Sequence, residues 1–458
     1  MEKKFKVPHI YVILCSIILT CTIATHILPA GEFERTMSSI GREVVVPGTY
    51  HTVEATPVGF FAMLQSLYKG LCNAAEIVFF TFLAYAAMGL VIQSGAFNGL
   101  ISWLLKILKG RARLAIIPIL ITVIGAISST IGLYEEMLPI VPVVVGLSIA
   151  MGYDALVGCG IVAFGLSMGL ACAAMNPFIM GIAKNIAGLP LTSGAGYRIF
   201  CHITMIIITS CFMMNYAAKI QKDPTKSMVY GDDFSRFRMD IDLENSSFGV
   251  RQQIILTFLV LVIGVIIWGC TSLGWYFNEL SAVFVLLGLV SAAIMGWGPS
   301  VIAEKMNKGF AEITTCCMMI GIARGIMVVM QEGQIIDTVV NALAVALVGL
   351  PSYISAAGMV IVQNLLNFLV PSGSGQAVIS MPIMAPLSDL IGVSRDTAVL
   401  AFQMGDGYSN IIWPTGFAPI FSGLAGVRVD KWWKWGAKIF ASIIIAQLIL
   451  VAISVFIW

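Results

Sequence analysis

The stretch Ser128-Ser-Thr-Ile-Gly132 lies between two apolar runs, and the stretch Ser372-Gly-Ser-Gly375 lies between two more in the second half of the chain. Each polar tip is followed by a long apolar segment that is interrupted near its middle, at Asn176-Pro177 and at Trp413-Pro414. In a membrane, backbone that is not helical has to be buried in protein or line a water-filled cavity. Two such interruptions in corresponding places predict a secondary transporter whose substrate site lies at the breaks.

Composition indicates a membrane protein. Of the 458 residues, 59% are apolar and 11% are charged, and the mean hydropathy is +0.94. A soluble globular protein carries about 25% charged residues. The net charge of +2 is divided between separate loops rather than pooled, so it indicates no nucleic-acid partner. We expect a polytopic protein whose partners are the lipid bilayer and a small-molecule substrate.

The sequence predicts no catalytic, metal or cofactor site. The ten cysteines are scattered without a C-x-x-C or metal-ligand spacing, and the four histidines are too dispersed to form a site. The chain also has no phosphate loop and no nucleophile–base spacing. We therefore expect no enzyme activity and no cofactor, apart from a proton or sodium ion coupled to transport.

Nine apolar runs are long enough to cross about 30 Å of hydrocarbon, two of them with a continuation past a break. We interpret the first as a retained span rather than a signal peptide, because its eighteen residues exceed a usual apolar core and lack a small-x-small cleavage site. The runs are Tyr11–Leu28, Ala75–Gln93, Ala155–Cys172, Tyr197–Ala218, Ile254–Cys270, Leu280–Gly296, Ile313–Met330, Thr397–Ile412 and Lys438–Trp458.

Two further segments, 114–151 and 353–391, predict re-entrant hairpins. The arms of the first, 114–127 and 137–151, would span only about 21 and 22 Å as helices, at 1.5 Å per residue. Both lengths fall short of a full crossing. The alternative is a pair of short full spans with the Glu135-Glu136 pair in an outside loop. Either arrangement returns the chain to the same side of the membrane.

Lysine and arginine predict the orientation. With a cytoplasmic N-terminus, nineteen of the 26 basic residues fall in inside segments, which satisfies the positive-inside rule. The mouths of the two hairpins then face opposite sides, which makes the repeat an inverted-topology repeat. The five basic residues expected outside are Arg35, Arg42, Lys69, Arg198 and Arg395.

The predicted fold is an all-α polytopic membrane protein with an inverted-topology repeat, two re-entrant hairpins, two broken spans and about nine full spans. Each half also contains two interfacial helices, the second of them at 97–109 and at 335–347. The tryptophans at 432, 433 and 435 predict an interfacial anchor. The predicted boundaries are 1–218 for the first repeat, with hairpin 114–151 and broken span 155–190, 219–251 for a cytoplasmic linker, 252–277 for a connecting span, and 278–458 for the second repeat, with hairpin 353–391 and broken span 397–425.

Three acidic side chains, Glu135, Glu136 and Asp406, are expected at membrane depth beside the duplicated breaks. Each costs about 2.5–3.5 kcal/mol there, which favours a functional reason for it. Arg324 is the main opposing charge, and Lys184 is expected to reach the interface by snorkelling. The alternatives are a salt bridge between the acid pair and Arg324, helix capping by the pair, and a solvated turn at Asp406. One arginine cannot balance three carboxylates, so the surplus indicates a cationic ligand, a coupling cation or protonated carboxyls.

Neutral polar groups at the tips and breaks predict the second half of the substrate site. Backbone amides and the positive end of a helix suit a carboxylate, while hydroxyls and carbonyls equally suit a cation. An amino acid with a positively charged side chain would match both the polar groups and the acids. In addition to the three acids, the predicted substrate-binding residues are Ser129, Thr130, Asn176, Ser372, Gly373, Ser374, Gln376, Asn410 and Thr415.

Several longer motifs surround the tips and breaks. They are Gly-Leu-Tyr-Glu-Glu at 132–136, Met-Asn-Pro-Phe at 175–178, Ile-Ala-Gly-Leu-Pro at 186–190, Ser-Gly-Ser-Gly-Gln-Ala at 372–377, Met-Pro-Ile-Met-Ala-Pro-Leu-Ser-Asp-Leu at 381–390 and Leu-Ala-Phe-Gln-Met-Gly-Asp-Gly-Tyr-Ser at 400–409. With these motifs the chain resembles the YfcC-like proteins of the four-carbon dicarboxylate anaerobic carrier (DcuC) grouping, within the ion transporter superfamily. This resemblance implies a bacterial inner-membrane carrier, a homodimer with elevator-like transport domains, and in several members the exchange of arginine, ornithine or other basic amino acids.

The acidic cluster favours an exchanger of arginine, ornithine or lysine. The alternative is a proton- or sodium-coupled carrier of four-carbon dicarboxylates, in which Arg324 would face the site as a carboxylate clamp. A channel is a third possibility, since hairpins also build pores.

Overall fold

The computed structural model describes residues 8–37, 43–99, 110–237 and 249–458, and within them regular structure is almost entirely helical. Helices satisfy their backbone groups within one segment, as a bilayer requires. The described strands form two small antiparallel pairs, Gly31–Glu32 (β1) with His51–Thr52 (β4) and Arg35–Met37 (β2) with Glu43–Val45 (β3). Lys3 to Lys6, Arg42, most of the interfacial helix expected at 97–109 and the middle of the linker lie outside the described residues.

The chain is a multi-pass membrane protein. In its described part, eight helices are long and apolar enough to cross a membrane. Six match expected spans, and the other two are the first arms of the hairpins. The helices that follow the expected spans are Ile10–Ala24 (α1), Ala75–Gln93 (α3), Ala155–Ala171 (α7), Ala195–Lys222 (α9), Val250–Ser272 (α10), Phe277–Met295 (α11), Pro299–Glu332 (α12), Arg395–Ser409 (α16) and Val429–Ser454 (α18).

Both predicted hairpins are present and end inside the protein. The first consists of the 3₁₀ turn Gly110–Ala115 (η1), Ile116–Thr130 (α5), a tight turn, the 3₁₀ turn Glu135–Ile140 (η2) and Val141–Ala150 (α6). The second consists of Ser352–Leu369 (α14) and Gly373–Leu390 (α15). Because the tip of the first hairpin is buried, with Glu136 only 9% exposed, the acid pair does not lie in an outside loop.

Each hairpin packs around one broken span. The helix α7 lies against α5 and α6, ends at Ala171 and resumes as Ile179–Ile186 (α8). The helix α16 lies against α14 and α15, ends at Ser409 and resumes as Ala418–Leu424 (α17). Pro177 and Pro414 fall in the two gaps, where they cannot donate a backbone hydrogen bond. The breaks are therefore structural features of both spans.

The backbone freed at each break is bonded by a neighbouring element. In the first break, the amides of Ala174 and Met175 donate to the carbonyl of Ser129 at 3.1 and 3.2 Å. In the second, the indole N–H groups of Trp432 and Trp433 donate to the carbonyls of Ile411 and Ile412 at 2.9 and 2.7 Å. Trp432 is fully buried, so the expectation that the tryptophan cluster anchors the protein at the membrane interface is wrong for this residue.

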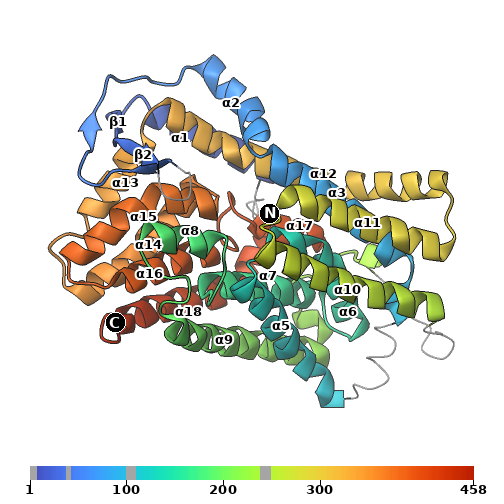
Figure 1. Cartoon of the computed structure of the whole chain (residues 1–458). Helices are drawn as coiled ribbons and strands as arrows, with labels where there is room; N and C mark the ends of the chain where they lie inside the picture. The colour runs from blue at the N-terminus through green and yellow to red at the C-terminus, as the bar shows by residue number, and fades with distance from the viewer. Residues whose placement is uncertain (1–7, 38–42, 100–109, 238–248) are drawn as a thin grey trace, which may run out of the picture.

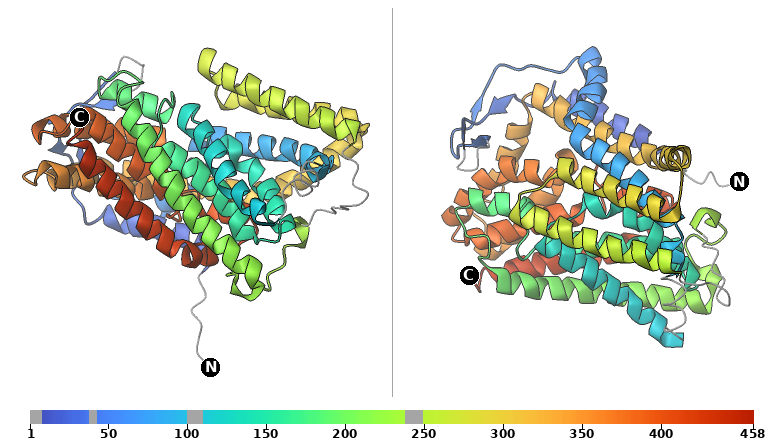
Figure 2. Two further views of the ribbon diagram at one scale, coloured as in Figure 1. Left: turned by 90° about the horizontal axis from the view of Figure 1, so that it is seen from below. Right: turned by 45° about the vertical axis from the view of Figure 1, so that its right-hand side comes forward.

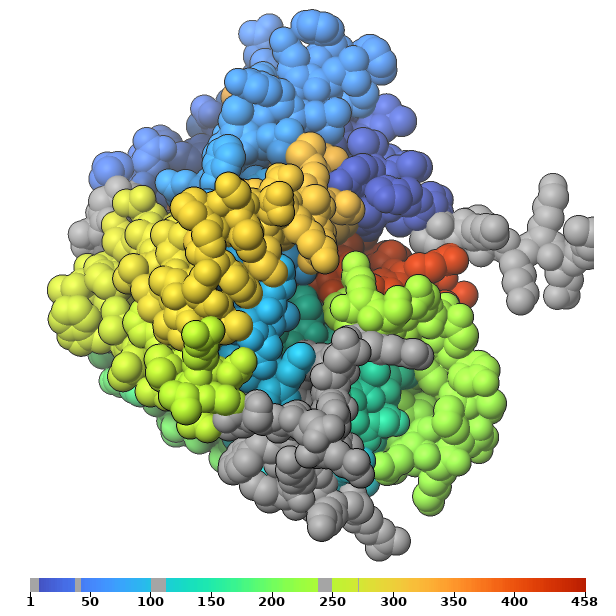
Figure 3. Space-filling view, turned by 90° about the vertical axis from the view of Figure 1, so that its right-hand side faces the viewer, coloured from blue at the N-terminus to red at the C-terminus, as the bar shows by residue number. Residues whose placement is uncertain are grey.

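The helices form two layers (Figure 1). The first layer consists of α1, Phe60–Asn73 (α2), α3, α11 and α12, which pack on one another, with α10 against α11. The second layer consists of the hairpins and broken spans together with α9 and α18. Figure 2 shows the same grouping from two other sides. In Figure 3, the yellow helices of the first layer lie beside the blue end of α3, and teal and red segments of the second layer are visible between them and the light-green stretch after α9.

Within the first layer, α12 crosses the α2–α3 pair by close contacts between glycine and backbone. A Cβ atom at Gly70 would lie 2.5 Å from the carbonyl oxygen of Gly321 and from the amide of Gly325. A Cβ atom at Gly309 would lie 2.8 Å from the Cα of Ala86. The expected interfacial helix before the span at 313–330 does not exist as a separate element, because α12 runs without interruption through both. The glycine contacts hold α12 closely against both α2 and α3.

Two side-chain contacts join α12 to α2 and α3 at the ends of this crossing. Lys69 forms an ion pair with Glu332. The Nζ of Lys305 donates to the Oε1 of Gln93 at 2.9 Å. The first contact joins α2 to the C-terminal end of α12, and the second joins α12 to the C-terminal end of α3.

Two basic residues expected near the outer surface are buried in the second layer. Lys184, expected to snorkel, is 1% exposed, forms an ion pair with Asp396 and donates to the carbonyl of Ser193 at 2.9 Å. Arg198, expected outside, is 0% exposed and donates from Nη1 to the Oε1 of Gln403 at 2.7 Å. The snorkelling expected of Lys184 is wrong, because α16 supplies a partner in the protein interior. That Arg198 lies on the outer side of the membrane stays a prediction.

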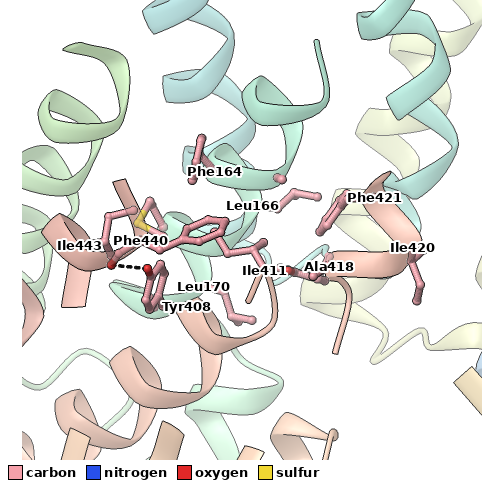
Figure 4. Close-up of a cluster of buried hydrophobic side chains, with 14 of the residues drawn as sticks. Phe164, Leu166, Leu170, Tyr408, Ile411, Ala418, Ile420, Phe421, Phe440 and Ile443 are labelled. Atoms are coloured by element: carbon pink, nitrogen blue, oxygen red, sulfur yellow. Dashed lines mark hydrogen bonds between the residues drawn. The ribbon is translucent and has the colours of Figure 1, made fainter. Parts of the chain in front are cut away.

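The second layer has an apolar centre where both broken spans meet α18 (Figure 4). Phe164, Leu166 and Leu170 of α7 face side chains of α17 and α18, and the hydroxyl of Tyr408 donates to the carbonyl of Phe440. The two halves of the chain thus share one core in this layer.

Replacing Asp396 with asparagine removes the counter-charge of the buried Lys184. Leaving one member of a buried ion pair unpaired costs about 3–5 kcal/mol. We expect the Asp396→Asn protein to unfold at a clearly lower temperature than the unchanged protein, as measured by thermal denaturation in detergent.

The matched control is Asp389→Asn, which breaks the Arg395–Asp389 pair of 2.6 Å, whose side chains are 40% and 49% exposed. Such exposed pairs contribute about 0–1 kcal/mol. Equal shifts of the two unfolding temperatures would contradict the structural role of Lys184 and Asp396.

Candidate functional site

A cavity of about 330 Å³ lies where both hairpin tips and both breaks meet the first layer. The second layer contributes the tips at 132–136 and 371–374, the break at 410–417, and Phe178 and Ile179 where the first break enters α8, while α2, α3, α11 and α12 contribute the facing wall. Its polar and charged lining consists of Asn73, Glu76, Tyr134, Glu135, Glu136, Tyr276, Arg324, Ser372, Ser374, Asn410 and Thr415. The site is thus divided between the two layers.

The predicted acid pair lines this cavity. Glu135 and Glu136 form the first turn of η2, directly after the positive-φ turn at Gly132. The Oε2 of Glu136 accepts a hydrogen bond from the amide of Tyr134 at 2.9 Å. Within the described residues, neither glutamate has an ion-pair partner within 4.0 Å. Two carboxyl groups therefore face the cavity with unused acceptor capacity.

Arg324 faces the same cavity from α12. Its Nη1 lies 3.9 Å from the Sδ of Met327, and it interacts electrostatically with Glu135 across the cavity. The structural salt bridge considered for Arg324 and the acid pair is not formed among the described residues. Glu76, at the start of α3, adds a third carboxyl group to the lining. The lining therefore contains three acidic groups and one basic group.

Asp406 lies behind the wall of the cavity rather than in its lining. It belongs to α16, is 1% exposed, and neither carboxyl oxygen has a hydrogen-bond partner in the described part of the chain. A Cβ atom at Gly373 would lie 2.9 Å from its Oδ2. The tip of the second hairpin therefore separates Asp406 from the cavity. The alternative of a solvated turn is wrong, because the residue is helical and buried.

The second hairpin tip presents a helix N-terminus to the cavity. Ser372 caps α15 by accepting the amide of Gly375 on its Oγ at 3.3 Å, and Ser372, Gly373 and Ser374 all line the cavity. The positive end of an eighteen-residue helix favours an anionic group at this position. Gln376 lies one turn further on, away from the cavity, where its Nε2 donates to both oxygens of Gln363 at 2.8 Å.

The predicted hydroxyls of the first tip are used elsewhere. The Oγ of Ser129 accepts the amide of Ala174 at 3.1 Å, so it stabilises the first break. Thr130 is exposed and donates to the carbonyl of Ala126 in its own helix at 2.7 Å. Neither residue belongs to the cavity lining.

Residues at the breaks keep unsatisfied polar atoms. Asn176 is fully buried beneath Gly132, and its Nδ2 has no partner in the described residues. The buried Oγ1 of Thr415 has none either. Asn410 lines the cavity and donates from Nδ2 to the carbonyl of Asp406 at 3.1 Å. Buried polar atoms are normally bonded, so these positions suit a ligand or water.

Several residues of the site were not predicted. Tyr134 is buried under the cavity, with its hydroxyl 2.9 Å from the Oγ of Ser167 and its ring 5.0 Å from that of Phe417. Asn367 donates from Nδ2 to the Oγ of Ser409 at 2.6 Å and to the carbonyl of Asp406 at 2.9 Å. The spacing of four residues between Gln363 and Asn367, which places both amides on one face of α14, is the signal that would have found Asn367.

The chain matches the family described as C4-dicarboxylate anaerobic carrier over residues 7–456. An uncharacterised protein of Haemophilus influenzae is 30% identical over 91% of this chain and 82% of its own length. An Escherichia coli protein named "Putative basic amino acid antiporter YfcC" is 28% identical over 98% of this chain and 96% of its own length. The solved structure of Neisseria gonorrhoeae MtrF, described as illuminating a class of antimetabolite efflux pumps, is 17% identical, with a TM-score of 0.47 over 98% of this chain and 96% of that one.

The expected family resemblance is therefore confirmed across almost the whole length of the chain. This multi-pass membrane protein belongs to the C4-dicarboxylate anaerobic carrier family of transporters.

Proposed function

We propose that the protein is a secondary carrier that exchanges basic amino acids such as arginine, ornithine and lysine. The observation that carries this proposal is the charge of the cavity, where Arg324 is the one basic residue of the described lining opposite Glu76, Glu135 and Glu136. Opposite charges stabilise one another strongly where water is largely excluded. A cationic substrate would balance the surplus that the protein leaves uncompensated.

The two ends of such a substrate would find different partners. The ammonium or guanidinium group would lie between Glu135 and Glu136, whose carboxyl groups keep unused acceptor capacity beside the bond from the amide of Tyr134 to Glu136. The α-carboxylate would lie at the N-terminus of α15, near Ser372 and Ser374. A cavity of about 330 Å³ is at the small end of the range for small-molecule sites, which is about 300–1,000 Å³.

Transport would use the division of the site between two layers. In this proposal the second layer carries the substrate past the first in an elevator-like movement, and the opposed hairpins open to opposite sides. The bias of lysine and arginine supports a cytoplasmic N-terminus in a bacterial inner membrane. The family resemblance is the basis for proposing a homodimer. The name of the Escherichia coli relative agrees with the proposed substrate class.

A four-carbon dicarboxylate is the second candidate, and the family description favours it. Arg324 and the start of α15 would then bind the two carboxylates. Three acidic groups in the lining oppose this assignment by charge repulsion, which is why we place it second.

The first test is counterflow in proteoliposomes that are preloaded either with ornithine or with succinate. We expect saturable uptake of labelled arginine into the ornithine-loaded vesicles and no uptake of labelled succinate into either kind. Uptake of succinate into the succinate-loaded vesicles alone would favour the dicarboxylate carrier. Arginine uptake that neither saturates nor needs internal substrate would indicate a channel.

The second test replaces Glu135 or Glu136 by glutamine, which keeps the shape and removes the charge. A hydrogen bond to a charged group contributes about 1.5–3 kcal/mol, so each change should weaken arginine binding roughly 10- to 150-fold. Isothermal titration calorimetry of the purified protein measures this loss.

The matched control is Glu304→Gln, the same change at an exposed position near the start of α12, outside the cavity lining. We expect it to bind arginine like the unchanged protein. Full arginine affinity in both cavity variants would contradict the assigned role of the acid pair.

A further inference from the structure

The carboxyl group of Asp406 is enclosed on every side and has no partner. It is 1% exposed, and neither Oδ1 nor Oδ2 accepts a hydrogen bond from any described residue. The half-buried carboxylate of Asp154 has a different environment. It accepts hydrogen bonds from the hydroxyls of Tyr216 and Ser227, both at 2.6 Å, and from the amide of Val157 at 3.0 Å. Asp406 therefore lacks the groups that stabilise an ionised carboxylate.

Among the described residues, the elements packed around Asp406 supply no ion-pair partner for it. The helix α14 faces it with the neutral side chains of Gln363 and Asn367, and Asn367 donates to its backbone carbonyl rather than to its carboxyl. The start of α15 contributes Gly373, and α8 contributes Ile179. Ala171 of α7 packs against Gly407, the residue that follows Asp406. From α18, the neutral Gln447 donates to the carbonyl of Met404, and the carbonyl of Phe440 accepts the hydroxyl of Tyr408.

The ionisable groups that interact with Asp406 are acidic, and two basic groups of the same layer are bonded elsewhere. Glu135 and Tyr134 interact electrostatically with Asp406 from the first hairpin tip. Lys184 is paired with Asp396, and Arg198 is bonded to Gln403. An ionised group left unpaired inside a protein lowers the free energy of unfolding by several kcal/mol, as happens when a buried ion pair loses one partner. A proton on the carboxyl group removes this cost.

The second hairpin tip covers this carboxyl group from the cavity side. One face of Gly373 lines the cavity, and on its other face a Cβ atom would lie 2.9 Å from the Oδ2 of Asp406 and 2.6 Å from the Cδ1 of Ile179. The tip closes this tightly only because Gly373 has no side chain. Movement of the tip away from α16 would connect the carboxyl group to the cavity and to water.

From this geometry we propose that Asp406 is a proton-binding site that is closed by the tip of the second hairpin and opens with it. The proton enters or leaves only while the tip is displaced, so proton exchange is tied to the conformational cycle of the carrier. Glu135 links this site to the substrate cavity, because it lines the cavity and interacts with Asp406.

The direction of coupling rests on the proposed function. A cationic substrate beside Glu135 stabilises negative charge at Asp406, so substrate binding and proton binding oppose one another, and by linkage the effect is reciprocal. The proton on the carboxyl oxygen would pass to water as the cation binds. An anionic substrate would have the opposite effect and would bind together with the proton.

The existence of the site is tested without any substrate by infrared difference spectroscopy of the unchanged protein and Asp406→Asn. We expect a carbonyl stretching band of a protonated carboxyl group that shifts in heavy water and is missing in Asp406→Asn. The control Asp389→Asn, at an exposed carboxylate of α15, should retain the band. A spectrum without the band, or with a band that survives in Asp406→Asn, would overturn the proposal.

The gate is tested by Gly373→Ala, whose added methyl group collides with Asp406 and Ile179. We expect the band to exchange its proton for deuterium faster than in the unchanged protein, because the tip can no longer close. An unchanged exchange rate would contradict the gating role of the tip. Equal unfolding temperatures would verify that the variants are folded. If Gly373→Ala does not fold, deuterium exchange is measured in the unchanged protein instead. We then expect one slow exchange phase limited by movement of the tip, and immediate exchange would overturn the proposal.

Coupling is measured by adding arginine to protein in weakly buffered detergent solution with a pH indicator. We expect about one proton released per arginine bound, and no release with Asp406→Asn at comparable occupancy. Binding without release in the unchanged protein would overturn the coupling, whereas an infrared band without arginine binding would overturn the substrate assignment alone. If arginine binding requires sodium and the infrared band of the protonated carboxyl group is absent, Asp406 binds a metal ion and the proposal is refuted.

Discussion

Backbone that leaves the helical state inside a membrane has to find hydrogen-bond partners, and the arrangement of the second layer depends on this requirement. Ser129 supplies both its carbonyl and its hydroxyl to the first break. Trp432 and Trp433 supply their indole N–H groups to the second. Because these donors and acceptors come from a hairpin arm and from α18, each break is held by an element other than its own span. Interrupted helices are therefore stable here only as parts of the whole layer.

The same requirement applies to charge. Lys184 is buried and forms an ion pair with Asp396, and the buried Arg198 donates to Gln403, so each bonds to a residue of the other half of the chain. The substrate cavity differs, since Glu135, Glu136 and Arg324 face it without an ion pair among the described residues. These two buried cations of the second layer thus have bonded partners, whereas charged groups without an ion-pair partner in the described part of the chain line the cavity where the two layers meet. This contrast is the physical basis for distinguishing the candidate site from the surrounding polar contacts.

The hairpins and breaks were predictable because proline, glycine and serine change the backbone locally, and the pattern of apolar residues fixes where the chain lies in the membrane. The acid pair at 135–136 was predictable for the same reason, since it follows the first tip directly. The burial of Trp432 beside Phe164 and of Arg198 beside Gln403 depends on contacts between the two halves of the chain. The use of Ser129 at a break and the position of Asp406 behind Gly373 depend on how each hairpin packs on its broken span. No local sequence pattern specifies which residues of two packed elements come into contact. The continuity of α12 was missed because an amphipathic start does not by itself end a helix.

The close crossing of α2 and α12 at Gly70, Gly321 and Gly325 has a practical consequence for measuring motion. Since these helices meet backbone to backbone, a label on α2 reports the position of the whole first layer. The exposed Cys72 lies two residues beyond Gly70 on α2, and the exposed Cys211 lies on α9 in the second layer. Once Cys15, also exposed, is replaced, labels on these two native thiols allow the distance between the layers to be measured by spectroscopy.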